Sequence, residues 1–315
     1  MLRLIVNRLL LGVLTLLAVS VLIFVCTQIL PGDVATAVLG QGATPEAVAL
    51  FRKELGLDTP AWLRYWNWFV GALQGDLGVA LTNKRVILDE ILPRLRNTMF
   101  LAAYAALIAI PVAVGLGVFA AINEGKLSDR LSNILTLIAI SLPEFFVAYL
   151  LIIAFAVGVD WFPSLSTVSP GMPLGERVYQ STLPAITLTL LVMAHMLRMT
   201  RSSVLSVMST PYIEMAFLKG AKRQRVITRH ALPNAAAPII TVVALNLAYL
   251  VVGVVVIEAV FVYPGLGQLM VDAVSKRDVP VIQACGLVFA MVFVLLNTLA
   301  DVLVILVNPR LRHKR

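Results

Sequence analysis

The chain has 315 residues, of which 60% are hydrophobic and only 13% are charged, and its mean hydropathy is +0.93. A soluble domain is about 45–50% apolar and about 25% charged, so this composition excludes a water-soluble enzyme and also a disordered chain. The two cysteines exclude a disulfide scaffold, and a net charge of +8 has to be interpreted from where the charges lie.

Six apolar stretches lie between charged residues, and each is long enough to cross a bilayer, which takes about 20 residues of helix. They predict an all-α integral membrane protein with six transmembrane helices. The stretches are residues 9–32, 97–123, 131–159 (interrupted only by Glu144), 178–197, 230–257 and 279–300. Four of them contain or border a proline that is expected to kink the helix, namely Pro111, Pro143, Pro184 and Pro238.

The first stretch has a basic start, like a signal peptide. Residues 9–32 are longer than the 7–15 residues or so of a signal-peptide core, so we expect a retained helix.

Segment 31–96 is too long for a simple hairpin. Thr44-Pro45-Glu46 is a helix-start signal, Gly56 is a helix stop, and apolar positions from Trp62 to Phe69 have helical spacing. We expect two or three short helices on the outer membrane face. Their aromatic residues are typical of a belt at the level of the lipid headgroups, and they also suit a docking surface for an external partner.

Basic residues concentrate on one side of the predicted spans. They occur before the first span, in loops 123–130 and 198–229, and in the tail, whereas loops 159–181 and 263–281 carry few. The positive-inside rule then predicts that both termini and loop 198–229 face the cytoplasm. The basic charge is therefore a sign of topology, and a nucleic-acid partner is not expected.

Loop 198–229 has the pattern of a rigid projection. Pro211 suits the first turn of a helix, Glu214 is favoured near the positive end of the helix dipole, and Gly220 suits a left-handed stop. We expect a short helix over 211–219. A basic loop whose side chains snorkel along the lipid surface is the alternative explanation of this segment.

This loop resembles the cytoplasmic signature of permease subunits of ATP-binding-cassette (ABC) importers. The signature runs Glu-Ala-Ala, three residues, Gly, nine residues, Ile, one residue, Leu-Pro. Met215 and His230 depart from it. The residues that match it in register are Glu214, Ala216, Gly220, Leu232 and Pro233.

The rest of the chain resembles one branch of that family, the dipeptide/oligopeptide/nickel permeases. Asn308 and Ala80 stand where this branch often has Asp and Ser. The matching residues are Leu30-Pro31-Gly32-Asp33, Leu55-Gly56-Leu57-Asp58-Thr59-Pro60, Arg64-Tyr65, Gly75-Asp76-Leu77-Gly78, Arg229-His230-Ala231-Leu232, Asn234-Ala235, Glu258, Phe261, Pro264-Gly265-Leu266-Gly267, Asp272-Ala273, Arg277-Asp278, Asn297, Asp301 and Pro309-Arg310.

The resemblance implies a type I ABC importer fold and a permease subunit that forms half of the pathway for a peptide or peptide-like solute. It also implies that the 211–220 helix docks on an ATPase subunit and moves with it. The residues assigned to this ATPase coupling are Pro211, Glu214, Ala216, Gly220, Leu232 and Pro233.

The implied partners are a homologous second permease in a heterodimer, two ATP-binding-cassette ATPases, an external substrate-binding protein and membrane lipid. The sequence has no GxxxxGK[ST] phosphate loop. We therefore expect ATP and Mg to be bound by the ATPases, with no cofactor, metal or catalytic site in this chain. The expected location is a bacterial or archaeal plasma (inner) membrane.

Three divisions of the chain are expected. Residues 1–96 would hold the first transmembrane helix and the external helical segment. Residues 97–308 would form a five-helix permease domain with the coupling loop 198–230, and 309–315 a basic cytoplasmic tail.

Three acidic residues lie within or at the ends of the predicted spans, where charge is costly and often functional. Glu144 would line a pathway for a cationic group or pair with a neighbouring helix. We expect Glu258 to have a structural partner, such as backbone amides at the following turn, and Asp301 to pair with a loop arginine.

Two other classes of protein remain as alternatives. A proton-coupled secondary transporter would show internal repeats and charges at its binding site, and a homo-oligomeric channel would show a filter loop or a charge ring. The substrate is not identified by the sequence, since relatives carry peptides, nickel chelates, opines and sugars.

Overall fold

The computed structural model describes residues 2–29, 36, 44–54 and 58–307. Within these ranges the chain is helical, and the only pairing of extended backbone is an isolated bridge between Val79 and Val86. In chain order the elements are α1 (Leu2–Ile29), α3 (Pro45–Glu54), α4 (Ala61–Leu73), α5 (Ile87–Ile122), α6 (Leu127–Ser141), α7 (Glu144–Leu151), the π-helix η1 (Ile152–Gly158), α8 (Leu174–Met208), α9 (Pro211–Leu218), α10 (Arg223–Val226), the π-helix η2 (Ile227–Ala231), α11 (Leu232–Val260), α12 (Leu266–Ser275) and α13 (Val279–Val307).

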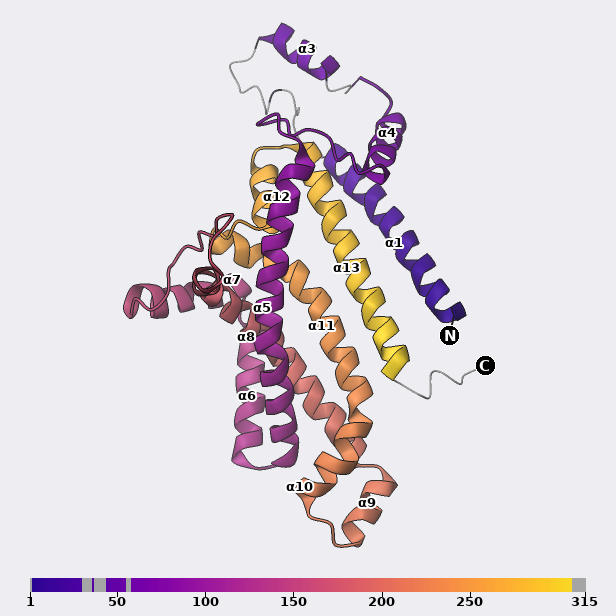
Figure 1. The fold of residues 1–315 in the computed structure, drawn as a ribbon, viewed down its shortest axis with the longest axis vertical. Coiled ribbons are helices and arrows are strands. Elements are labelled where there is room, and N and C mark those ends of the chain that lie inside the picture. Colours follow the sequence, from indigo (N-terminus) through magenta and orange to yellow (C-terminus); the bar gives the residue numbers. More distant parts are fainter. Residues whose placement is uncertain (1, 30–35, 37–43, 55–57, 308–315) are drawn as a thin grey trace.

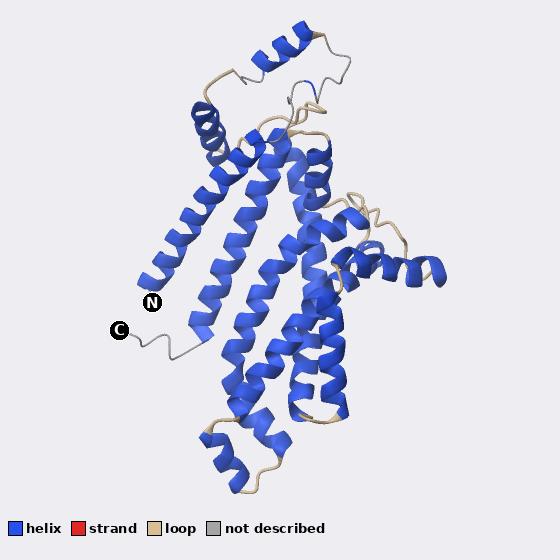
Figure 2. Cartoon of the chain, turned by 180° about the vertical axis from the view of Figure 1, so that it is seen from behind, coloured by secondary structure: helices blue, strands red, loops and turns tan. Residues whose placement is uncertain are grey.

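The long helices run side by side along the long axis of an elongated bundle (Figure 1). The short helices α9 and α10 close one end, which we call the α9 end, and α3, α4 and α12 lie toward the opposite end, the α12 end (Figures 1 and 2). The start of α1, the α5–α6 turn and the end of α13 all point toward the α9 end. The expected arrangement of loops relative to the termini is therefore present in the fold.

Five helices of the described residues are long and apolar enough to cross a membrane, and a sixth crossing is obtained if α6 and α7–η1 count as one span. That pair is bent by 106°. The break falls at Leu142-Pro143, where Leu142 has extended backbone angles (φ −86°, ψ 134°) and α7 starts immediately after the proline. A residue before proline avoids helical angles, which explains why the helix stops there.

The other three prolines behave differently from Pro143. Pro111, Pro184 and Pro238 lie inside continuous helices α5, α8 and α11. The helices also extend beyond the charges that bounded the predicted spans, because α8 includes both Arg177 and Arg198. Charged residues thus limit the apolar part of a helix without ending the helix.

The predicted segment before the second span contains two short helices in its described part, as expected. α3 starts at Pro45, and the predicted stop at Gly56 lies outside the described residues, as do the matches at 30–33 and the tail 309–315.

Tyr65 of α4 hydrogen-bonds Ser20 of α1 through the two hydroxyl oxygens, which lie 2.9 Å apart. Trp62 and Trp66 are left exposed (71% and 58%).

Small residues allow close helix contacts, as is common in membrane bundles. A Cβ added to Gly117 of α5 would lie 2.7 Å from Thr200 Cβ of α8. Gly12 of α1 and Gly286 of α13 each leave 3.0 Å between an added Cβ and the facing side chain. The pair α1–α13 is also joined by a hydrogen bond that Gln283 Nε2 donates to Thr27 Oγ1 over 2.8 Å.

Glu258, near the end of α11, is fully buried and holds the α12 end together. Its carboxylate accepts hydrogen bonds from Thr98 Oγ1 (2.6 Å) and from the backbone N–H groups of Gly267 (2.7 Å) and Gln268 (3.2 Å). Thr98 Oγ1 in turn accepts from the N–H of Leu266. The prediction that backbone amides of the following turn are partners of Glu258 is confirmed.

Replacing Gly265 with alanine tests this arrangement. The added Cβ would lie 2.0 Å from Glu258 Oε1, so the carboxylate has to move away from its donors. Hydrogen bonds to a charged group contribute roughly 1.5–3 kcal/mol each. We therefore expect a lower thermal unfolding midpoint of the purified membrane protein in detergent. Gly115→Ala is the matched control, because no atom lies within 4 Å of its added Cβ. Equal midpoints for the two variants would contradict the prediction.

Candidate functional site

The α9 end carries the short helix that the sequence predicts. α9 begins at Pro211 after the extended residue Thr210, and Gly220 follows with φ +80°. Two backbone hydrogen bonds close the turn, from Gly220 N–H to Phe217 O (2.8 Å) and from Ala221 N–H to Ala216 O (3.2 Å). The left-handed stop at Gly220 is therefore confirmed, and it ends the helix sharply.

One face of α9 anchors the helix to the bundle. Ile213 is fully buried against Val226 and Ala231, and Ala216 packs on the same cluster. Ala216 therefore faces the bundle, where its small side chain allows a close approach.

The other face of α9 is apolar and open. Met215 and Leu218 are 53% and 75% exposed, and Tyr212 and Phe217 are also exposed. These side chains are not part of the family signature, so the resemblance did not point to them. The available signal was the presence of five large apolar residues in an eight-residue helix outside the predicted spans.

The six residues assigned to ATPase coupling do not form one surface. Pro211 and Glu214 are exposed in the first turn of α9, and Gly220 is exposed just after it. Leu232 and Pro233 lie in the first turn of α11 instead, and Leu232 packs on a buried cluster of α5, α8 and α11 residues. These two residues belong to the base that supports the loop.

Two ion pairs join the loop and its supporting helices to the α5–α6 hairpin. Arg201 of α8 binds Asp129 of α6 with two hydrogen bonds, Nε to Oδ1 (2.6 Å) and Nη2 to Oδ2 (2.8 Å), and the Asp129 side chain is only 4% exposed. Arg223 Nη2 lies 2.9 Å from Glu124 Oε2 in a more exposed pair. The segments on both sides of α9, α8 and α10, are therefore each joined to the hairpin by an ion pair.

Asp301 also has a basic partner, but the predicted type of partner is wrong. Its Oδ2 lies 2.9 Å from Arg8 Nη1, and Arg8 belongs to α1 rather than to a loop. The contact follows from the packing of α1 on α13, which the sequence does not reveal.

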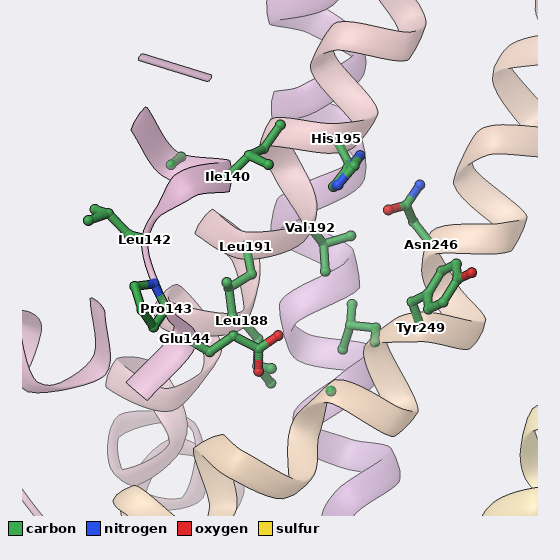
Figure 3. A pocket seen from close by; sticks show the side chains of 13 residues that line it. Ile140, Leu142, Pro143, Glu144, Leu188, Leu191, Val192, His195, Asn246 and Tyr249 are labelled. Atoms are coloured by element: carbon green, nitrogen blue, oxygen red, sulfur yellow. The ribbon is translucent and has the colours of Figure 1, made fainter. Parts of the chain in front are cut away.

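A cavity of about 420 Å³ lies beside the break between α6 and α7. Glu144, His195 and Asn246 line it together with apolar side chains of α6, α8 and α11 (Figure 3). Of the two predictions for Glu144, the structure favours a place on a cavity, because no described residue forms an ion pair or hydrogen bond with its carboxylate.

Comparison with known protein families shows which family the chain belongs to. Residues 113–313 match the family "Binding-protein-dependent transport system inner membrane component", and residues 1–102 match the N-terminal part of such membrane components. The chain belongs to this family. It is the membrane-spanning permease subunit of a binding-protein-dependent ABC importer in a bacterial inner membrane, and it is not itself an ATPase.

Individual relatives agree with this assignment. The glutathione transport system permease protein GsiC of Escherichia coli O6:H1 is 38% identical over 314 residues, covering 100% of both chains. The GsiC protein of Salmonella typhimurium is 37% identical over the same length and coverage. The fold is similar to that of a chain of the inward-facing MetNI methionine ABC transporter, with a TM-score of 0.53 and 17% identity over 69% of this chain and 96% of that one.

The ion pair at the α9 end generates a testable prediction for the permease. Asp129→Asn leaves the Arg201 guanidinium partly buried without its counter-charge, which typically costs ~3–5 kcal/mol. We expect a lower thermal unfolding midpoint in detergent. The double variant Asp129→Asn/Arg201→Gln removes both charges and should regain part of the loss. If the destabilisation of the double variant equals the sum of the destabilisations measured for Asp129→Asn and Arg201→Gln separately, the two residues do not interact.

Proposed function

We propose that α9 of this permease is the docking element for an ATPase subunit. The observation that carries the proposal is the exposed apolar face of Tyr212, Met215 and Leu218 on a helix that is anchored from behind by buried Ile213. Exposed apolar side chains that gather outside the membrane are typical of an interaction surface. The α9 end would then face the cytoplasm, in agreement with the basic residues of loops 123–130 and 198–229.

The anchoring makes α9 suitable for transmitting movement. A rigid element that is packed on the bundle passes a displacement on, whereas a loose loop would absorb it. Gly220 and its two backbone hydrogen bonds hold the end of the helix, and the Arg201–Asp129 and Arg223–Glu124 pairs connect the base to the hairpin. Closure of an ATPase dimer would thus tilt α8 and α6 together.

We infer an assembly in which this chain supplies half of the pathway. A homologous second permease would supply the other half in a heterodimer, with two ATPases at the α9 end and a substrate-binding protein at the α12 end. In the proposed division into 1–96, 97–308 and 309–315, the first boundary falls inside α5, and the segment before α5 adds α3 and α4 to the α12 end.

The proposed substrate is a peptide-like solute. Relatives that align over the full chain are named for glutathione transport, so glutathione is the first solute to test. The test is uptake into proteoliposomes that contain this permease, its second permease and its ATPases, with the binding protein and glutathione outside. We expect uptake that requires ATP inside. Uptake that survives loss of the ATPases and is abolished by a proton uncoupler would instead support a secondary transporter.

Leu218→Asp tests the docking surface directly. A carboxylate on this exposed position would be desolvated in an apolar groove, so we expect loss of ATPase co-purification and of ATP-driven uptake with normal membrane insertion. Leu127→Asp is the control, because Leu127 is an equally exposed leucine (81%) on the α5–α6 turn at the same end. Unimpaired ATPase binding by Leu218→Asp would refute the assignment.

Gly220→Val tests the geometry of the helix end. The left-handed conformation at φ +80° costs roughly 1–2 kcal/mol for a residue with a Cβ and more for a β-branched one. We expect reduced uptake per ATP hydrolysed. Asparagine tolerates this conformation, so Gly220→Asn should retain most of the coupling. If the valine and asparagine variants take up the same amount of solute per ATP hydrolysed, the turn at Gly220 has no role in coupling.

A further inference from the structure

The cavity beside the α6–α7 break is lined by side chains from four helices, α6, α7, α8 and α11. Its volume of about 420 Å³ lies within the range of sites for small molecules. Its walls are apolar, with Ile140, Leu188 and Leu191 among them, and the chain break at Leu142-Pro143 forms one edge (Figure 3). The cavity therefore lies between α6, α7, α8 and α11.

Among the described residues that line the cavity, Glu144 is the only aspartate, glutamate, lysine or arginine. It is the first residue of α7, so the 106° bend at Pro143 directs it away from the line of α6. Its carboxylate points toward α11 in Figure 3. There it lies over Gly253, where an added Cβ would be 3.9 Å from Glu144 Oε1.

The charge of Glu144 has no counter-charge within the described residues, since no lysine or arginine lines the cavity and no ion pair involves this carboxylate. Two buried acids of the bundle, Glu258 and Asp129, are each bound by several donors. Glu144 thus differs from them in offering its acceptor capacity to the cavity.

The other polar side chains that line the cavity are those of His195, Asn246 and Tyr249. The Asn246 amide donates to Val242 O (2.8 Å) of its own helix, which leaves its carbonyl oxygen as an acceptor. The imidazole of His195 can donate or accept a hydrogen bond. In Figure 3 both groups lie at the end of the cavity away from Glu144. The site thus places the Glu144 carboxylate at one end and the hydrogen-bonding groups of His195 and Asn246 at the other.

We propose that the Glu144 cavity is a transient binding site in which the carboxylate receives the ammonium group of the transported solute. The solute would be a small molecule with a primary ammonium group at one end, such as the α-ammonium of a short peptide, and with a polar part that reaches His195 and Asn246. This inference rests on the proposed import function and specifies the chemistry of the substrate that passes.

The first experiment measures the charge of the cavity without any substrate. A Val192→Cys reporter in a Cys26→Ser background places a thiol on the cavity wall of the assembled complex in lipid nanodiscs. It is labelled with methanethiosulfonates that carry either a trimethylammonium or a sulfonate group, and the reaction is followed by mass spectrometry. We expect Glu144→Gln to lower the cation-to-anion rate ratio about tenfold, equal to ~1.4 kcal/mol, because an isolated carboxylate nearby attracts a cation strongly.

The control places the reporter thiol at exposed Leu127, where Glu144→Gln should leave the ratio unchanged. An unchanged ratio at the Val192→Cys position would overturn the proposal, since it would mean that another subunit neutralises Glu144. A thiol at that position that reacts with neither reagent would also overturn it, because the cavity would then be closed to water.

The second experiment measures transport by the complete complex with glutathione as the probe. Glu144→Gln should lower the uptake efficiency about tenfold while leaving ATPase co-purification intact, and Glu144→Asp should retain part of the uptake. Wild-type uptake by Glu144→Gln would overturn the ammonium site. If the wild-type complex does not import glutathione at all, the proposed substrate fails, whereas the labelling ratio still decides whether the cavity selects cations.

Discussion

A polar group in an apolar medium must find its partner within the chain, and this constraint governs the structure. Helical hydroxyl groups such as those of Thr187 and Thr241 donate to the carbonyl four residues earlier. The buried acids Glu258 and Asp129 are surrounded by donors from other elements. The hydroxyl bonds stay within one helix, whereas each of the two carboxylates ties different elements together and so defines which helices must stay in contact. Against this background, an unpartnered acid inside the bundle points to a ligand.

The two ends of the bundle use different means of holding their elements. At the α12 end, one carboxylate gathers Thr98 and the first turn of α12 in a fully buried contact. At the α9 end, an apolar anchor at Ile213 and a bidentate ion pair at Asp129 hold the loop and the hairpin. The apolar outer face of α9 is left free by this arrangement. A subunit that binds there acts on a base that is already rigid.

Local signals were sufficient to predict most elements. Pro211 and Gly220 predicted the bounds of α9, and Thr44-Pro45-Glu46 predicted the start of α3, because these residues act on their own backbone. The break at Pro143 was not distinguishable in this way, since three other prolines lie inside continuous helices. The partner of Asp301 and the cavity at Glu144 also depend on packing between distant segments. The apolar face of α9 was visible in the sequence, but its exposure was not.

The packing of α1 on α13 has a consequence for biosynthesis. The contacts of Gly12, Gly286 and the Arg8–Asp301 pair join the first and last helices of the chain. During translation α1 enters the bilayer before α13 has been synthesised. Until then its α13-facing surface contacts lipid or the insertion machinery. The contact between α1 and α13 can form only after α13 has been synthesised, so this part of the bundle is assembled after the helices that lie between them in the chain.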